Sequence, residues 1–110
     1  MPRHLLTDFE LMLLLAILRV GDEAYGVEIA REIEATGGRR VQLGAAYAAL
    51  ARLEAQGLVR SRTGEPTARR GGRAKRYFFV TPAGLHAVKA TRSALTALWR
   101  GLPQLREVMP

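Results

Sequence analysis

The sequence predicts a mainly α-helical fold with one small β-hairpin. Three observations predict this class: apolar residues recur at helical spacing up to residue 57, two short strand-like segments flank a glycine-containing loop, and a further helical pattern follows Pro82. A chain of 110 residues with 48% hydrophobic residues can bury one core. We therefore expect one structural unit, in which residues 1–80 form the first part and residues 81–110 a C-terminal helix.

The first predicted helix begins after Thr7. The segment Thr7-Asp8-Phe9-Glu10 fits a capping box, in which the threonine hydroxyl and the glutamate carboxylate each accept a hydrogen bond from the other residue's amide. Apolar residues then recur at helical spacing until Gly21, namely Leu11, Leu14, Leu15 and Leu18. Because Met12 and Ile17 widen this stripe, we expect the helix to be buried on more than one side.

Two further helices are predicted before Gly57. Tyr25-Gly26 leads into the second helix, which ends at Gly37-Gly38, and the third opens at residues 41–44. The apolar positions of the third helix are Leu43, Ala46, Tyr47, Leu50 and Leu53. Its predicted opposite face has small residues with one cation and one amide: Ala45, Ala48, Ala49, Arg52 and Gln56. Such a face can lie close to another surface, as a helix in the major groove of DNA must.

A hairpin and a last helix complete the predicted order. Residues 58–63 and 76–80 have the composition of strands, and the residues between them are basic and too numerous for a tight turn. After three helices, a long hairpin loop of this kind is a wing. Thr81 then supplies an N-cap and Pro82 the first helical position, and the helix is expected to end near Arg100.

Apolar residues along the last predicted helix recur in alternating steps of three and four, the pattern of a heptad seam. The seam and the residue that widens it are Leu85, Val88, Arg92, Leu95, Leu98, Trp99 and Leu102. Because three short helices cannot bury both sides of this helix, we expect a homodimer in which the first helix is its neighbour across the interface. Arg92 is costly in such a seam unless it is paired or solvated.

Charge is distributed unevenly along the chain. The net charge is +7, and residues 60–92 contain nine basic residues against Glu65 alone. A surplus confined to one region favours a surface that docks a polyanion, whereas a general solubility surplus would be spread more evenly. The alternative interpretation is a solvated basic loop.

Taken in order, the motifs of residues 7–100 resemble the PadR family, in particular its short members with a single C-terminal helix. The matching residues are Ala24-Tyr25-Gly26, Ile29, Gly44, Tyr47, Leu50, Arg52-Leu53-Glu54, Gly57-Leu58-Val59, Gly72-Arg73, Lys75-Arg76-Tyr77 and Thr81-Pro82-Ala83-Gly84. The resemblance implies a winged helix-turn-helix transcriptional repressor, usually dimeric, that binds a palindromic operator and is often released by a small molecule. Family members commonly have Ser or Thr near the start of the recognition helix. This chain has Gln42 and Ala45 there, so its phosphate contact must differ.

The third helix and the wing are the expected DNA contacts. The residues concerned are Tyr25, Gln42, Gly44, Ala45, Tyr47, Ala48, Ala49, Arg52, Arg69, Arg70, Arg73, Lys75 and Arg76. Helix amides near Gly44 can hold a phosphate, and Arg52 can reach the backbone or a guanine edge. The wing cations would contact phosphates, and an arginine near the tip could enter the minor groove. The alternative is that the alanines only favour a helix on a solvated face, and that Tyr47 packs in the core.

Trp99 is the only tryptophan in the chain. We expect it to pack in the dimer interface; its alternative role is to stack a small, flat aromatic effector between the subunits, as in multidrug-responsive relatives.

Several function classes are excluded or disfavoured. Without cysteine the chain has no disulfide, thiolate metal site or cysteine nucleophile, and His4 and His86 lie far apart with no acidic or metal-ligand cluster, so we expect neither an enzyme nor a cofactor. No segment has the length of a membrane span or the order of a signal peptide, which predicts a cytoplasmic protein. The remaining alternatives are a winged-helix module that binds RNA or an acidic protein partner, and a structural dimer. An aromatic content of 6% disfavours single-stranded nucleic acid and leaves duplex DNA preferred.

Overall fold

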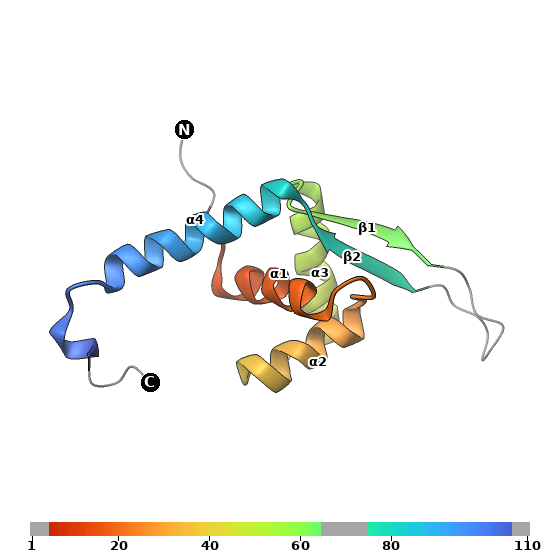
Figure 1. Ribbon diagram of the computed structural model, residues 1–110. Helices are drawn as coiled ribbons and strands as arrows, with labels where there is room; N and C mark the ends of the chain where they lie inside the picture. Colours follow the sequence, from red (N-terminus) through yellow and green to blue (C-terminus); the bar gives the residue numbers. More distant parts are fainter. Residues whose placement is uncertain (1–4, 65–74, 107–110) are drawn as a thin grey trace.

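A computed structural model describes residues 5–64 and 75–106. The elements follow in the order α1 (Asp8–Val20), α2 (Gly26–Gly37), α3 (Leu43–Ala55), β1 (Val59–Thr63), β2 (Arg76–Val80), α4 (Pro82–Trp99) and the short 3₁₀ helix η1 (Pro103–Leu105). Figure 1 shows α1, α2 and α3 grouped together, with the hairpin on one side and α4 extending to the other. The predicted class, mainly helical with one antiparallel hairpin, is confirmed.

The start of α1 is fixed by the predicted capping box. The Thr7 hydroxyl accepts from the Glu10 amide at 3.2 Å, and the Glu10 carboxylate accepts from the Thr7 amide at 2.9 Å. The side of α1 that meets the core differs from the predicted stripe. Leu13, Leu14 and Ile17 are buried, whereas Leu15 and Leu18 are 42% and 47% exposed. The physical reason is that α1 is apolar on almost every side, so leucine spacing alone does not select the core face.

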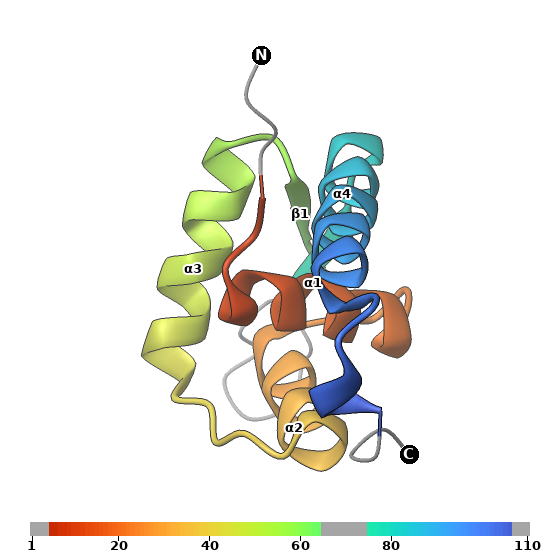
Figure 2. The same ribbon diagram turned by 90° about the vertical axis from the view of Figure 1, so that its left-hand side faces the viewer.

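The core lies where the three helices meet the hairpin. Its largest fully buried side chains come from α1, α2, α3 and β1, namely Leu13, Leu14, Ile29, Leu50, Leu53 and Val59. Figure 2 shows α3 on one side of the domain and α4 on the other. The core therefore fixes α3 through one face and leaves its opposite face free.

The two strands are short and antiparallel. Val59 pairs with Val80 at one end of the ladder and Thr63 pairs with Arg76 at the other. The Phe78 amide also donates to the Ala24 carbonyl at 2.8 Å, which joins β2 to the segment that precedes α2. The hairpin is thus attached to the helical part through both its packing and its backbone.

The beginning of α4 is joined to the turn that follows α3. Thr81 accepts from the Gly84 amide at 3.0 Å and donates to the Gly57 carbonyl at 2.7 Å. Gly84 lies so close to the Leu58 carbonyl that a Cβ at this position would overlap with it. Because both contacts involve backbone atoms, the end of α3 and the start of α4 form one rigid joint.

The distal half of α4 leaves the rest of the domain (Figure 1). Leu95, Leu98 and Trp99 are exposed there, Leu98 to 75%. Within the described residues, no helix is long and apolar enough to cross a membrane. Among the described residues, the distal half of α4 thus presents an uncovered apolar surface.

Candidate nucleic-acid interface

The exposed face of α3 consists of residues with very small side chains. Gly44, Ala48, Ala51 and Ala55 are all exposed and follow at steps of four, three and four, which places them on one line along the helix. The opposite line, Ala46, Leu50 and Leu53, is buried. The backbone of α3 can therefore approach another surface closely along the whole length of the helix.

Of the three alanines predicted as DNA contacts, two are exposed and one is buried. Ala45 and Ala48 are exposed, but Ala49 is 1% exposed and belongs to the core, so it cannot contact a ligand. The prediction placed the face too far around the helix, because it treated Ala49 as surface on account of its size. Ala51 and Ala55 were missed, although their spacing from Gly44 was a signal that could have identified them.

Longer side chains lie at the edges of the α3 face. Arg52 and Gln56 are exposed, and among the described residues Arg52 takes part in no ion pair. Tyr47 is 43% exposed and its ring lies directly over Gly26, where a Cβ would overlap with the phenol. The expectation that Tyr47 is a core position of α3 is therefore wrong, because its phenol packs over the surface of Gly26 and stays partly open to solvent.

The start of α3 has no side-chain cap. Gln42 occupies the N-cap position without a side-chain hydrogen bond to the helix, and Gly44 is open to solvent. Arg40, which precedes it, is exposed, whereas its neighbour Arg39 pairs with Asp8 at 3.1 Å. Free helix amides beside an arginine favour an anion. Arg40 was missed by the sequence interpretation, although a basic residue shortly before a helix is a usable signal.

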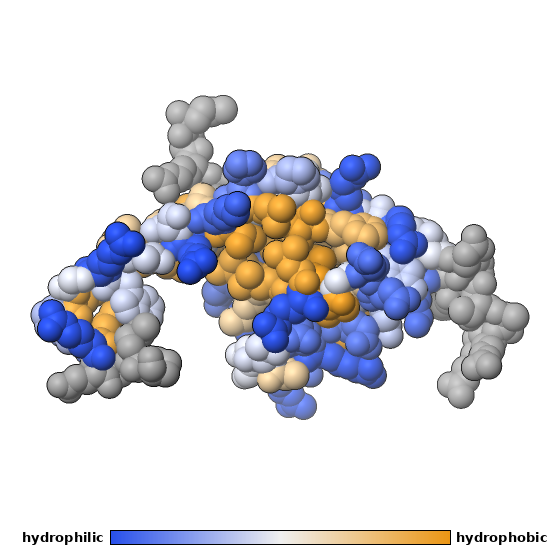
Figure 3. Space-filling view, in the orientation of Figure 1, coloured by the Kyte–Doolittle hydropathy of each residue, from blue (hydrophilic) through white to orange (hydrophobic). Residues whose placement is uncertain are grey.

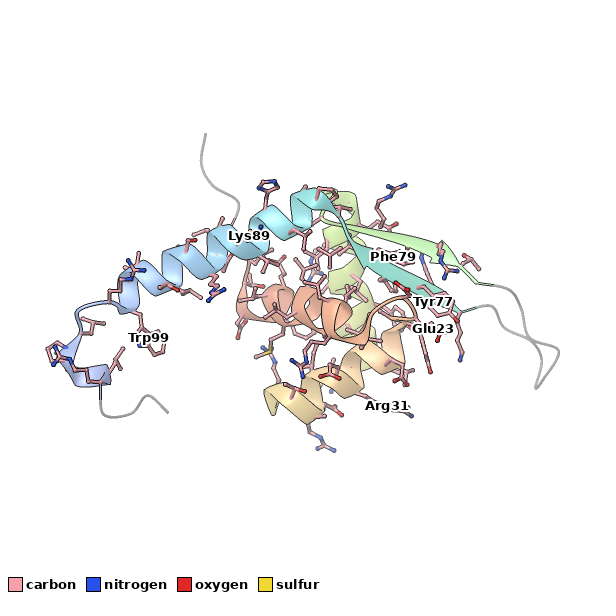
Figure 4. All side chains as sticks on the ribbon, viewed as in Figure 1. Glu23, Arg31, Tyr77, Phe79, Lys89 and Trp99 are labelled. Atoms are coloured by element: carbon pink, nitrogen blue, oxygen red, sulfur yellow. The ribbon has the colours of Figure 1, made fainter. Side chains whose placement is uncertain are left out.

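Cations at the loop end of the two strands rest on aromatic rings. The Arg62 guanidinium lies 4.8 Å from the centre of the Tyr77 ring and 5.5 Å from that of Phe79. Lys75 lies 4.4 Å from the centre of the Tyr25 ring, and Tyr25 meets Tyr77 edge to face. Figure 4 shows Tyr77 and Phe79 along β2, on the side of the domain where Glu23 lies. These contacts hold exposed positive charges in fixed positions.

Arg76 joins the hairpin to α3. Its Nε donates to the Ser61 hydroxyl at 2.9 Å and its terminal nitrogen to Glu54 at 3.4 Å, while Ser61 itself donates to Glu54 at 2.8 Å. Arg76 was predicted as a phosphate contact; in the structure its guanidinium is engaged by Ser61 and Glu54, and the phosphate contact stays a prediction. Tyr25 is similarly engaged, because its hydroxyl donates to Glu28 at 3.2 Å.

Three predicted wing contacts, Arg69, Arg70 and Arg73, lie outside the described residues. Within the described part, no group of His, Asp and Glu side chains is arranged to hold a metal ion.

A second surface lies between α1 and α4. It is an apolar groove of about 410 Å³ lined by Leu11, Leu15, Val88, Leu95, Trp99 and the side chains of Arg92, Thr96 and Arg100. Figure 3 shows the apolar surface that spreads over the middle of the domain, and Figure 4 shows Trp99 on the distal half of α4. Four of the predicted seam residues therefore line one groove together with α1. Leu85, Leu98 and Leu102 are exposed outside it.

Comparisons with known proteins agree with this architecture. The sequence matches the family model of the transcriptional regulator PadR-like family over residues 14–90. A transcriptional regulator from Clostridium thermocellum is 24% identical over 81% of this chain and 83% of that chain, with a TM-score of 0.68. A PadR family transcriptional regulator from Eggerthella lenta DSM 2243 is 23% identical over 89% and 83%, with a TM-score of 0.65.

A PadR family transcription regulator from Clostridium difficile R20291 is also 23% identical, over 89% of this chain and 98% of that chain, with a TM-score of 0.66. These structural similarities confirm the predicted winged-helix fold. No curated protein sequence matches the chain significantly.

Proposed function

The chain belongs to the transcriptional regulator PadR-like family, and on this premise we propose that it is a repressor that binds a palindromic DNA operator as a homodimer and is released by a small aromatic molecule. The observation that carries the proposal is the exposed line of Gly44, Ala48, Ala51 and Ala55 on α3. A helix that fits the major groove needs a face that lets its backbone approach the base edges. Few long donors lie on this face, so DNA shape should contribute to the choice of site.

Cations on both sides of α3 support contact with the DNA backbone. Arg40 precedes the helix, Arg52 lies on its edge, and Arg62 and Lys75 are held on aromatic rings at the loop end of the two strands. The wing cations Arg69, Arg70 and Arg73 would extend this positive surface along the phosphates. Together they favour duplex DNA over an acidic protein partner, because several cations of α3 and the hairpin could each contact a phosphate of a regular polyanion.

The apolar groove between α1 and α4 supports the homodimer. Leu95 and Trp99 are 51% and 48% exposed in the described structure, and Leu15 lines the same groove from α1. A twofold axis would let each α4 cover the α1 of the other protomer, so that identical surfaces become buried together. The two α3 helices would then enter successive major grooves about 34 Å apart.

The same groove supports an effector that acts between the subunits. Trp99 offers a flat ring for stacking, and Arg92 and Arg100 line the groove. A planar molecule inserted there would change the separation of the protomers. Because α4 is joined to the end of α3 through Thr81 and Gly84, the spacing of the reading helices would change with it.

Selection of bound duplexes from a random library tests the proposal directly. We expect a palindromic site with half-sites one helical turn apart and a dimer in sedimentation experiments. A protein that is monomeric at micromolar concentration and has no preference among duplexes would refute it. Tighter binding to RNA than to any duplex would favour the alternative module.

A second experiment separates backbone contacts from base contacts. Replacing Arg69, Arg70 and Arg73 with alanine should weaken binding to all duplexes similarly and reduce the salt slope by roughly 0.9 per lost phosphate contact. Arg52→Ala should instead change the preference among sites. Arg31→Ala is the matched control, because Arg31 pairs with Glu28 and points away from α1 on the outer side of α2 (Figure 4). Unchanged affinity and slope in the triple variant would remove the wing from the interface.

A further inference from the structure

Three side chains, those of Glu54, Ser61 and Arg76, join the end of α3 to both strands of the hairpin, and we call them the Glu54 network. Glu54 accepts hydrogen bonds from the Ser61 hydroxyl at 2.8 Å and from a terminal nitrogen of Arg76 at 3.4 Å. The Nε of Arg76 also donates to the Ser61 hydroxyl at 2.9 Å, so each residue contacts the other two. Among the described residues, no other hydrogen bonds run from α3 to β1 or β2. The network is therefore the polar link between α3 and the hairpin.

The Glu54 network occupies one face of the hairpin, and an exposed cation lies on the other. Successive side chains of a strand point to opposite faces, and Arg62 directly follows Ser61. Arg62 therefore lies on the face that is turned away from Glu54, where its guanidinium rests on the rings of Tyr77 and Phe79. The network thus fixes the position of Arg62 relative to α3 without engaging Arg62 itself.

We propose that Glu54 is a positioning residue for DNA binding: it holds the hairpin at the angle at which Arg62 and Lys75 reach phosphates while α3 lies in the major groove. This inference rests on the proposed function. The bond between the Phe78 amide and the Ala24 carbonyl attaches β2 to the segment before α2, and the network is the corresponding attachment on the side of α3. Both cations lie at the loop end of the strands, which extend away from the three helices (Figure 1). A small change of angle would move this end of the hairpin furthest.

The charge of Glu54 works against DNA binding, so its benefit must come from orientation. Glu54 is the only acidic residue of α3, and a carboxylate beside a reading helix repels phosphates. Its pair with Arg76 contributes little to the stability of the fold, because the two side chains are 33% and 59% exposed. The network can therefore be removed with a small effect on folding and a large effect on the geometry of the interface.

The direction in which Glu54→Ala changes DNA affinity tests the proposal. Removing a carboxylate makes the protein more positive, so electrostatics alone predict tighter binding to every duplex. The positioning role predicts the opposite: binding to the selected operator about tenfold weaker and a smaller salt slope, because phosphate contacts of the hairpin are lost. Glu32→Ala is the matched control, since it also removes a partly exposed carboxylate from a pair with an arginine, but between α1 and α2. It should bind the operator at least as tightly as the wild type.

A second variant separates position from charge. Ser61→Ala removes the hydroxyl that bonds to both other members of the network and leaves the net charge unchanged. It should weaken operator binding and lower the salt slope in the same direction as Glu54→Ala. Urea denaturation of each variant establishes that it is folded under the conditions of the DNA titration.

Coupling to the hairpin cations shows whether Glu54 acts through them. Replacing both Arg62 and Lys75 with alanine should itself weaken operator binding. In that background Glu54→Ala should have less than about a twofold further effect, because the contacts that it positions are already lost. A tenfold loss in both backgrounds would mean that Glu54 acts by another route, and it would overturn the proposal.

The outcomes distinguish this inference from the proposed function. If the wild type selects a palindromic duplex and Glu54→Ala binds that duplex as tightly or more tightly, the positioning role is overturned and the function stands. The same conclusion follows if the variant without Arg62 and Lys75 binds like the wild type. A wild-type protein without preference among duplexes overturns both. Weaker binding in Glu54→Ala and Ser61→Ala, absent from the background that lacks the two cations, establishes the positioning role.

Discussion

At the scale of single residues, Gly44 shows how stability and binding can oppose each other on α3. A Cβ at this position would meet nothing within 4 Å, so Gly44→Ala should stabilise the fold by up to about 1 kcal/mol through helix propensity. The same methyl group would stand on the face that approaches DNA. We expect binding to weaken by roughly fivefold or more, as for an overlap that costs about 1 kcal/mol.

Urea denaturation and a DNA-binding titration measure the two effects of Gly44→Ala separately. Gly37→Ala is the matched control, because Gly37 is also helical and a Cβ there would make only ordinary contact with Ile33. It should leave DNA binding unchanged. Unaltered DNA affinity in Gly44→Ala would show that this face does not approach the duplex.

Gly84 is predicted to respond in the opposite direction. Its neighbours are the Leu58 carbonyl and the Val80 side chain, and a backbone carbonyl cannot move aside as a flexible side chain can. Gly84→Ala should therefore destabilise the protein by roughly 1–3 kcal/mol, the usual cost of an overpacked site. Thermal or urea unfolding checks this, with Gly37→Ala again as control. A variant of wild-type stability would mean that the joint between α3 and α4 is not tight.

Single residues also show which structural features a local sequence pattern was sufficient to predict. The capping box at Thr7 and the N-cap at Thr81 were predictable because each depends on a few adjacent residues. The burial of Ala49 was not predictable, because alanine occurs both on surfaces and in cores. Only the packing of α3 against the rest of the domain decides which of the two applies. The pairing of Arg76 with Glu54 joins residues that are 22 positions apart, which periodicity does not address.

At the scale of elements, α1 and α2 are joined on their exposed side by the pair Arg19 and Glu32, at 2.8 Å. The Thr36 hydroxyl, followed by Arg19, lowers the pKa of Glu32. A carboxyl with a lowered folded-state pKa stabilises the fold above its unfolded pKa of about 4.3, and the stabilisation is lost as the pH falls through the folded value. We expect the difference in stability between wild type and Glu32→Gln to be small, present at pH 7 and lost in this acidic range.

Urea denaturation of both proteins at neutral and acidic pH measures this dependence. Thr36→Val removes the largest cause of the lowered pKa and should reproduce part of the effect. A difference between wild type and Glu32→Gln that is the same at both values of pH would contradict the assignment.

Elements differ in how far the sequence determined them. The starts and ends of α2 and α4 were predicted within a residue, because glycines and the Thr81-Pro82 pair mark them. The core face of α1 was not, because a helix that is apolar on nearly all sides gives no contrast between faces. Its exposed Leu15 lines the groove between α1 and α4, a tertiary feature that spacing within a single helix cannot show.

At the scale of the whole molecule, Trp99 is predicted to report on both the dimer and the effector. It is the only tryptophan, so intrinsic fluorescence monitors this one position on the distal half of α4. We expect planar aromatic compounds to quench it and to weaken DNA binding over the same concentration range. Trp99→Ala should weaken the dimer, since a large aromatic side chain would no longer be buried between protomers.

Separate results test the two parts of this prediction. Compounds that neither quench Trp99 nor release DNA would remove the effector, and an equally stable dimer in Trp99→Ala would remove Trp99 from the interface. His86→Ala serves as a comparison, because His86 is exposed near the start of α4 and belongs neither to the predicted seam nor to the lining of the groove.

The joint at Thr81 and Gly84 gives the molecule the mechanics of a lever. With 18 residues, α4 extends about 27 Å from this pivot to Trp99. A displacement of about 3 Å at the Trp99 end then corresponds to a rotation of only about 6° at the pivot, because the arm is long. An effector bound near Trp99 would thus change the orientation of α3 through a small rotation at this joint. A tilt of α4 would be enough to put the two α3 helices of a dimer out of phase with the turn of the double helix.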